Sequence, residues 1–312
     1  MLDRYRSILE GEIKPYYLQA KEQRASEDYY ELDQEELWSE IDEFRRKNKV
    51  PPLDLKIELA KEMIKRCDLC ERGCGVNRKK DEKGYCQVKE SKISSEFLHM
   101  GEEKELVPSH TVFFAGCNFG CVFCQNYEIS QLNQGREIPS EILSKKIESG
   151  GGKNVNWVGG DPTPNLTYIL EVLKKMNKPV PQIWNSNMYL SEKCMKLLSQ
   201  LMDVYLTDFK YGNDECARKL SDVEDYTFIL RRNHLIAEKT GDLIIRHLVL
   251  PGHLECCTKP LLEWIDSNLE NPKLNIMTQY RPVWQADEYT QINRYLNREE
   301  KKEIRKLRKK YS

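Results

Sequence analysis

Six short apolar runs, rich in β-branched and aromatic residues, alternate with stretches of helical periodicity in the second half of the chain. The runs are TVFFAG (111–116), VNWVGG (155–160), QIWNSN (182–187), VYLTDF (204–209), LIIRHLVL (243–250) and LNIMTQY (274–280). The stretches between them are long enough for crossover helices, which predicts parallel strands with right-handed connections. Six such units are too few for a closed eight-stranded barrel of about 250 residues. We therefore expect an α/β fold, a partial (βα)6 TIM-like barrel that is open on one side.

The flanking segments carry different patterns. Residues 1–66 are very polar but have apolar positions three and four apart, as in LDQEELWSEIDEF, which predicts an N-terminal helical extension. Residues 67–107 are rich in Cys, Gly and charge and are expected to be a metal-binding segment. Residues 108–285 hold the barrel units, and residues 286–312 end in a basic stretch that predicts a C-terminal helix.

Composition narrows the class of protein. The 312 residues include 49 basic and 50 acidic side chains, and a net charge of −1 gives no reason to expect a nucleic-acid or membrane partner. No apolar run approaches the ~18 residues that a bilayer span needs, and the first residues lack a signal-peptide pattern. We expect a cytoplasmic protein. Seven of the 11 cysteines fall in two short-spaced sets within 67–124, which in that compartment indicates metal or cluster ligation.

The strongest chemical signal is GCNFGCVFCQN, which places Cys117, Cys121 and Cys124 on a loop directly after the first apolar run. Three thiolates at this spacing can each bind one iron of a [4Fe–4S] cubane, and the fourth iron then stays open to a small molecule. A loop at the carboxyl end of a strand is also where α/β barrels carry their active sites. Half of a zinc site is the alternative, although zinc sites favour paired knuckles and four ligands.

The pattern Cys-x3-Cys-x-aromatic-Cys, with Phe123 as the aromatic residue, resembles the radical S-adenosylmethionine (SAM) superfamily. The resemblance covers about residues 108–285 and is strongest to the branch related to pyruvate formate-lyase activating enzyme. It implies that a [4Fe–4S] cluster binds SAM and reductively cleaves it to methionine and a 5′-deoxyadenosyl radical, which abstracts hydrogen from a substrate. A protein, as in the activases of glycyl radical enzymes, or a peptide is a candidate substrate, and flavodoxin or ferredoxin a candidate reductant.

The resemblance also assigns SAM contacts to polar residues that follow the later runs. Gly159, Gly160 and Asp161 resemble the family's Gly-Gly-Glu motif, which binds the SAM amino group, with a shorter carboxylate here. The adenine would lie against Phe123. The remaining residues with an implied role around SAM are Asn185, Ser186, Asn187, Asp208 and Lys210, with Lys210 meeting the SAM carboxylate.

The fifth run resembles the family's Arg-containing strand with a following Pro-Gly turn. Strand alternation puts Arg246 and His247 on opposite faces, so at most one of them points into the barrel. We expect Arg246 to be a charge partner in the SAM site and His253, just after the turn, to lie at its rim.

A second set of cysteines precedes the barrel: Cys67, Cys70, Cys74 and Cys86. Four thiolates on a Gly-rich loop can bind Zn²⁺ tetrahedrally or hold a second iron–sulfur cluster. The spacing does not decide between these metals, and we favour iron–sulfur slightly. The other four cysteines, Cys194, Cys216, Cys256 and Cys257, are expected to be free thiols.

Two other functions are compatible with the cysteines alone. An iron–sulfur electron carrier or cluster-binding protein would bind fully ligated clusters and perform no SAM chemistry, and a zinc-stabilised scaffold would perform no reaction. Neither has a use for Gly159, Gly160, Lys210 and Arg246, which follow successive runs in order. We therefore favour the radical SAM interpretation.

Overall fold

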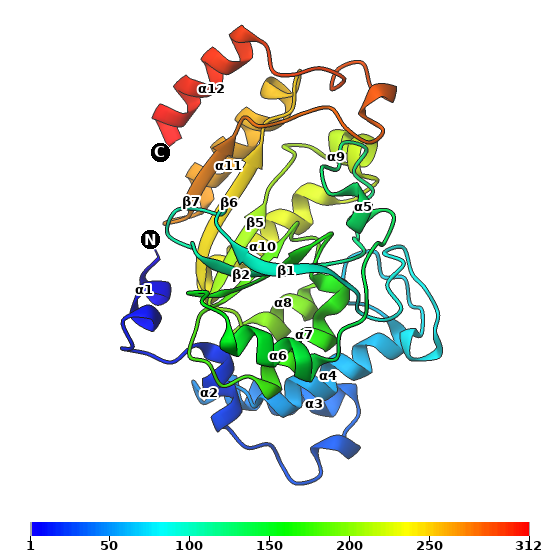
Figure 1. The fold of residues 1–312 in the computed structure, drawn as a ribbon, viewed down its shortest axis with the longest axis vertical. Coiled ribbons are helices and arrows are strands. Elements are labelled where there is room, and N and C mark those ends of the chain that lie inside the picture. Colours follow the sequence, from blue (N-terminus) through cyan, green and yellow to red (C-terminus); the bar gives the residue numbers. More distant parts are fainter. Residues whose placement is uncertain (1, 312) are drawn as a thin grey trace.

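A seven-stranded sheet forms the centre of the computed structural model, which describes residues 2–311 (Figure 1). Six parallel strands follow one another in chain order: β2 (Ser109–Phe114), β3 (Val155–Gly159), β4 (Gln182–Ser186), β5 (Val204–Asp208), β6 (Asp242–Leu248) and β7 (Lys273–Met277). Each of the six apolar runs supplies one of them. The connecting helices are α6 (Ser140–Ser149), α7 (Leu166–Lys175), α8 (Glu192–Leu198), α9 (Asp214–Ser221), α10 (Tyr226–Thr240) and α11 (Lys259–Asn268). The predicted partial barrel is confirmed.

An additional strand that the sequence pattern did not predict extends the sheet. Strand β1 (Ile93–His99) pairs antiparallel with β2, and Phe97 stacks on Phe113 at a ring-centroid distance of 5.5 Å. Most side chains of this edge strand are exposed or half-buried, so its sequence lacks the apolar run that marks the buried strands. The loop from β1 to β2 brings Glu102 and Glu103 to the interior of the barrel.

The N-terminal extension contains several helices, and the first of them closes the end of the barrel at which the strands begin. Helix α1 (Asp3–Leu9) lies at the amino ends of the strands, where the backbone amide of Tyr5 donates to Asp242 at 2.7 Å and Arg4 pairs with Asp203 at 2.9 Å. The side chains that fill this end form a separate apolar cluster: Leu2, Tyr5, Leu106, Ile183, Val204, Leu206 and Ile244. Helix α1 therefore closes the barrel at the amino ends of its strands.

The following helices form an outer layer on one side of the barrel. They are α2 (Tyr16–Glu22), α3 (Gln34–Arg46) and α4 (Leu53–Met63). Helix α3 packs on α4, and α4 packs on α7 (Figure 1). The fully buried Lys56 of α4 donates to the carbonyls of Leu197 and Ser199 at 2.8 and 2.6 Å, which satisfies the carboxyl end of α8.

The carboxyl-terminal helix covers the other edge of the sheet. Helix α12 (Arg298–Tyr311) buries Ile304 and Leu307, and Arg308 Nε donates to the Ile276 carbonyl of edge strand β7 at 3.0 Å. Covering an edge strand in this way blocks pairing with another chain. Between residues 2 and 311, no helix is both long and apolar enough to cross a membrane.

Candidate functional site

A cavity of about 410 Å³ lies at the carboxyl ends of the parallel strands, where barrels of this kind carry their sites. Ten of the eleven residues predicted to contact SAM line it: Phe123, Gly159, Gly160, Asp161, Asn185, Ser186, Asn187, Asp208, Lys210 and Arg246. Cys117, Cys121 and Cys124 line the same cavity. The fold thus brings together groups from strands β3 to β6 and from the cysteine loop.

The cysteine loop runs from the end of β2 to the short helix α5 (Tyr127–Ser130) and is fastened to the end of α9. The amides of Gly120 and Val122 each donate at 3.0 Å to the carbonyls of Ser221 and Leu220. The hydroxyl of Ser221 also lies 2.8 Å from Cys121 Sγ. Similarly, the hydroxyl of Ser130 lies 3.0 Å from Cys124 Sγ. Two of the three sulfurs are therefore held by hydroxyl groups.

The surroundings of these thiols favour their neutral form unless a cation is bound. Burial raises the pKa of Cys121 to about 12, although the Lys210 ammonium acts in the opposite direction. Burial also raises the pKa of Cys117 well above its usual range, and the nearby Asp161 carboxylate adds to the effect. Buried thiols of this kind become thiolates when a metal replaces their protons. The donor set therefore fits a metal or cluster.

Two glycines at the end of β3 allow its backbone to approach the cysteine loop closely. Gly159 has φ +136°, and a Cβ there would collide with the backbone of Phe114. A Cβ on Gly160 would collide with the carbonyl of Gly116, one residue before the first cysteine of the loop. The amides of Gly160 and Asp161 donate to the carbonyls of Phe114 and Gly116 at 2.9 and 3.0 Å. The Gly-Gly pair is thus required by packing, in addition to any contact with a ligand.

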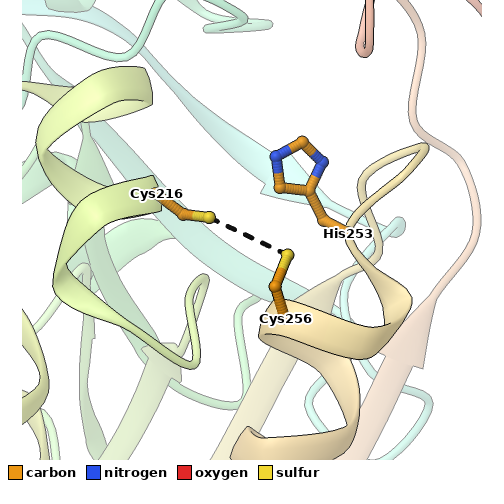
Figure 2. Close-up of side chains that lie close together, drawn as sticks. All are labelled: Cys216, His253 and Cys256. Atoms are coloured by element: carbon orange, nitrogen blue, oxygen red, sulfur yellow. Dashed lines mark hydrogen bonds between the residues drawn. The ribbon is translucent and has the colours of Figure 1, made fainter.

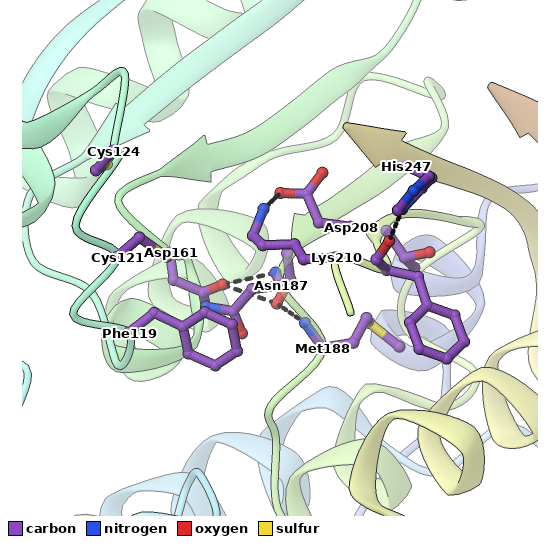
Figure 3. A network of polar contacts seen from close by, with 12 residues as sticks. Phe119, Cys121, Cys124, Asp161, Asn187, Met188, Asp208, Lys210 and His247 are labelled. Carbon is purple, nitrogen blue, oxygen red and sulfur yellow. Dashed lines mark hydrogen bonds and ion pairs between the residues drawn. The ribbon is translucent and has the colours of Figure 1, made fainter. Parts of the chain in front are cut away.

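The carboxylate of Asp161 joins two of the cavity's loops. It is 1% exposed and accepts hydrogen bonds at 2.9 Å from the amide of Thr163 and the hydroxyl of Ser186. It also accepts one at 2.9 Å from the amide of Asn187 (Figure 3). Burial raises its pKa, against the three hydrogen bonds. With its oxygens engaged in this way, Asp161 orients its neighbours.

The carboxamide of Asn187 reaches the cysteine loop. Its Nδ2 donates to Asn118 Oδ1 at 2.7 Å and lies 3.7 Å from Cys117 Sγ. Asn187, just after β4, therefore helps to position the first cysteine of the loop. Asn185, near the end of the same strand, lines the cavity.

The ammonium group of a lysine lies beside the cysteine loop. Lys210 Nζ is 2.5 Å from Asp208 Oδ2 at the end of β5 (Figure 3). Burial lowers the pKa of Lys210, but the charges of Asp208 and Cys121 outweigh this effect and the net pKa is raised. Lys210 is therefore a fixed positive charge next to the thiols.

The cavity contains an acidic pair that the sequence pattern did not predict. Arg246 Nε donates to Glu103 at 2.8 Å, and the same guanidinium pairs with Glu102. Asn275 donates to Glu103, and Asn156 to Glu102, both at 2.9 Å. Arg246 lines the cavity, and its charge is shared between two carboxylates that are each 5% exposed. Two adjacent acidic residues after an edge strand carry no signal that would have predicted this contact.

The second set of cysteines packs directly against the cysteine loop. The carbonyl of Cys86 would lie 2.9 Å from a Cβ on Gly116. Arg72, between Cys70 and Cys74, donates to the Asn118 carbonyl at 2.9 Å. Burial raises the pKa of Cys70 and of Cys86, and the charges of other cysteines of the set add to this effect. Which metal they bind, if any, stays a prediction.

The structure does not bring His253 to this cavity. Its imidazole is 5% exposed and lies beside Cys216 and Cys256, two cysteines expected to be free thiols. That grouping joins α9 to the turn after β6 and was not visible from local spacing.

The chain is similar to one protein family and to several known proteins. A family model described as the radical SAM superfamily matches residues 111–265. An uncharacterized protein of Methanocaldococcus jannaschii is 51% identical over 269 residues, which make up 83% of this chain and 79% of that protein. The pyruvate formate-lyase 1-activating enzyme of Escherichia coli K12 is 25% identical over 151 residues, or 45% of this chain and 60% of that enzyme.

Among solved structures, methylornithine synthase aligns with a TM-score of 0.45 and 13% identity. The alignment covers 97% of this chain and 76% of that protein.

Proposed function

Because the chain contains a radical SAM domain, matched over residues 111–265, we propose that Cys117, Cys121 and Cys124 bind a [4Fe–4S] cluster whose fourth iron is available to SAM. The observation that carries this proposal is the convergence of the three thiols and ten further predicted residues on one cavity. When bound and reduced, the cluster supplies the electron that cleaves SAM to methionine and a 5′-deoxyadenosyl radical, which abstracts hydrogen from a substrate.

The separation of the thiols supports a cluster over a single ion. Two sulfurs bound to one tetrahedral zinc at ~2.3 Å lie about 3.8 Å apart. Within residues 2–311, these three sulfurs do not all lie within 4.8 Å of one another. At least one pair is thus farther apart than one ion requires, as expected for ligands of different irons in a cubane.

The chain's own residues would bind and orient SAM. Lys210 offers a positive charge to the SAM carboxylate, and Asp208 holds the Lys210 ammonium in place. The backbone at Gly159 and Gly160 provides the approach for the SAM amino group, and Asp161 fixes the two neighbouring loops. Phe123, 4% exposed, offers a flat apolar surface to the adenine. Arg246, engaged by Glu102 and Glu103, shapes the polar floor of the cavity.

The second set of cysteines is proposed to hold another iron–sulfur cluster, with zinc as the alternative. In the described part of the chain, no three of these four sulfurs all lie within 4.8 Å of one another, so the set is spread more widely than one zinc ion requires. Iron and zinc analysis of the Cys117→Ala/Cys121→Ala/Cys124→Ala variant tests this assignment, because iron that remains belongs to the second set. A variant without iron contradicts a second cluster.

The activity is proposed to resemble that of the activating enzymes in acting on a protein or peptide, with flavodoxin or ferredoxin as reductant. The support is the distant similarity to the pyruvate formate-lyase 1-activating enzyme. An iron–sulfur electron carrier without SAM chemistry is the competing function.

Anaerobic incubation with dithionite and SAM, followed by chromatography for 5′-deoxyadenosine, separates the two functions. We expect 5′-deoxyadenosine from the wild-type chain and from Cys194→Ala, a buried cysteine outside both sets. We expect none from Cys121→Ala, which should also lose the iron of one cluster. If the iron-loaded wild type leaves SAM intact, the chain is an electron carrier.

A further inference from the structure

Three side chains outside the cavity form a compact group of metal-binding donors. Cys216 lies on α9, and His253 and Cys256 lie on the turn between β6 and α11 (Figure 2). Their ligand atoms all lie within 4.8 Å of one another. The two sulfurs are 3.9 Å apart, well beyond the ~2.05 Å of a disulfide bond.

These distances match the coordination sphere of a tetrahedral ion. With zinc–sulfur bonds of ~2.3 Å and tetrahedral angles, two sulfurs lie about 3.8 Å apart. The observed 3.9 Å between Cys216 Sγ and Cys256 Sγ therefore needs almost no rearrangement. Two thiolates and one imidazole are also the donor types that zinc prefers.

A backbone carbonyl fixes the tautomer of the histidine. Its Nδ1 lies 2.8 Å from the carbonyl oxygen of Pro251. A carbonyl only accepts hydrogen bonds, so Nδ1 carries the proton and Nε2 presents its lone pair. A backbone carbonyl that fixes the tautomer of an imidazole is the usual outer-shell partner of a metal-bound histidine.

The two cysteines have similar support. Asn213 Nδ2 lies 3.4 Å from Cys216 Sγ and donates to the carbonyl of Cys256 at 2.7 Å, so one carboxamide fixes both sides of the group. Cys256 is part of a π-helical turn, Leu254–Thr258, and such turns are frequent at functional sites.

We propose that Cys216, His253 and Cys256 bind one Zn²⁺ ion, with a fourth position open to water. Binding replaces the two thiol protons and transfers no electrons. The ion joins α9 to the turn after β6, and the far end of α9 holds the cysteine loop through Leu220 and Ser221. The bound ion would therefore stabilise the position of α9, the helix that holds the cysteine loop. This inference does not depend on the proposed SAM chemistry.

The test is the metal content of the full-length protein, purified anaerobically and equilibrated with zinc. Zinc and iron per chain are measured for the wild type, for Cys216→Ser/Cys256→Ser and for the control Cys194→Ala. We expect the double variant to contain one zinc fewer per chain than the wild type, and the control to match the wild type. Any zinc bound by the second set of cysteines is present in both proteins, so it cancels when the zinc contents of the wild type and the double variant are subtracted.

A second measurement keeps the proposal testable if the double variant folds poorly. His253→Ala leaves α9 and both thiols unchanged, and zinc competition with a chromophoric chelator should show affinity at one site reduced at least about tenfold. Equal zinc content in the wild type and the folded double variant would overturn the proposal. So would unchanged zinc affinity in His253→Ala, or an intact disulfide between Cys216 and Cys256 in the anaerobically purified protein.

Discussion

The Arg246→Met substitution removes the cation that two buried carboxylates share inside the barrel. Glu102 and Glu103 are each 5% exposed in their side chains, and Arg246 is 16% exposed. Methionine keeps much of the apolar stem of arginine, so the main loss is the charge and its hydrogen bonds. The variant therefore leaves two negative charges side by side in a site that water hardly reaches.

The size of the effect follows from burial. Removing one partner of a buried ion pair costs about 3–5 kcal/mol. With an unfolding entropy of ~2.1 cal/mol/K per residue, a chain of 312 residues has ~0.66 kcal/mol/K in total, so the expected fall in Tm is roughly 5–8 °C. Circular dichroism of the anaerobic protein during heating measures it.

The effect also has a predictable pH dependence. In the wild type, burial raises the pKa of Glu103 but the Arg246 hydrogen bond and charge outweigh it, so the net pKa is lowered. This carboxylate stabilises the wild type above its ordinary pKa and stops doing so as the pH falls through the lowered value. In the variant, Glu103 lacks the cation that lowers its pKa while burial still raises it, so it protonates at a higher pH than in the wild type, which relieves the buried charge. The difference in Tm should therefore shrink as the pH falls from neutral toward the ordinary pKa of a carboxyl group.

The control removes the carboxylates as well. Glu102→Gln/Glu103→Gln/Arg246→Met replaces the ion pairs with neutral groups of similar shape, and it should recover most of the lost Tm with little pH dependence. The reasoning is refuted if Arg246→Met melts at the wild-type temperature, or if its deficit stays constant across this pH range.

Two further substitutions separate binding from stability. Lys210→Met should weaken SAM binding about 10–100-fold without loss of iron, because a charged hydrogen bond contributes about 1.5–3 kcal/mol; calorimetric titration measures this, with exposed Lys193→Met as control, and an unchanged affinity removes Lys210 from the site. Tyr5→Ala opens the end of the barrel that α1 closes and should cost about 3–5 kcal/mol, seen as a lower Tm with unaltered SAM affinity. Tyr5→Phe keeps the ring and should lose only the hydroxyl's two hydrogen bonds, one from Asn154 and one to the Glu105 carbonyl; equal Tm values for the two Tyr5 variants would contradict closure of the barrel by α1.

Much of the candidate site was predictable because its parts are encoded locally. The spacing of Cys117, Cys121 and Cys124 places three thiols on one loop, and no distant segment is needed to bring them together. Asp161, Asn187 and Lys210 lie at or just after the ends of buried strands, and parallel strands align their carboxyl ends at one edge of a sheet. Residues at such ends converge whatever the details of the helices between them.

Other features depend on contacts that the sequence pattern does not encode. Arg246 and Glu103 are 143 positions apart, and Glu103 enters the barrel only because an exposed edge strand turns back beside β2. Cys216 and Cys256 are 40 positions apart on elements that show no shared spacing. Likewise, α1 has ordinary apolar periodicity, which predicts a buried face but not the barrel end that receives it.

The sequence by itself therefore determined the strand order, the helical extension and the local cysteine pattern, because hydrophobic periodicity and short spacing are properties of neighbouring residues. The tertiary structure alone decided which charges meet in the cavity, which helix closes the barrel and where Cys216, His253 and Cys256 come together. These contacts depend on how loops of different strands pack, and packing is fixed only when the whole chain has folded.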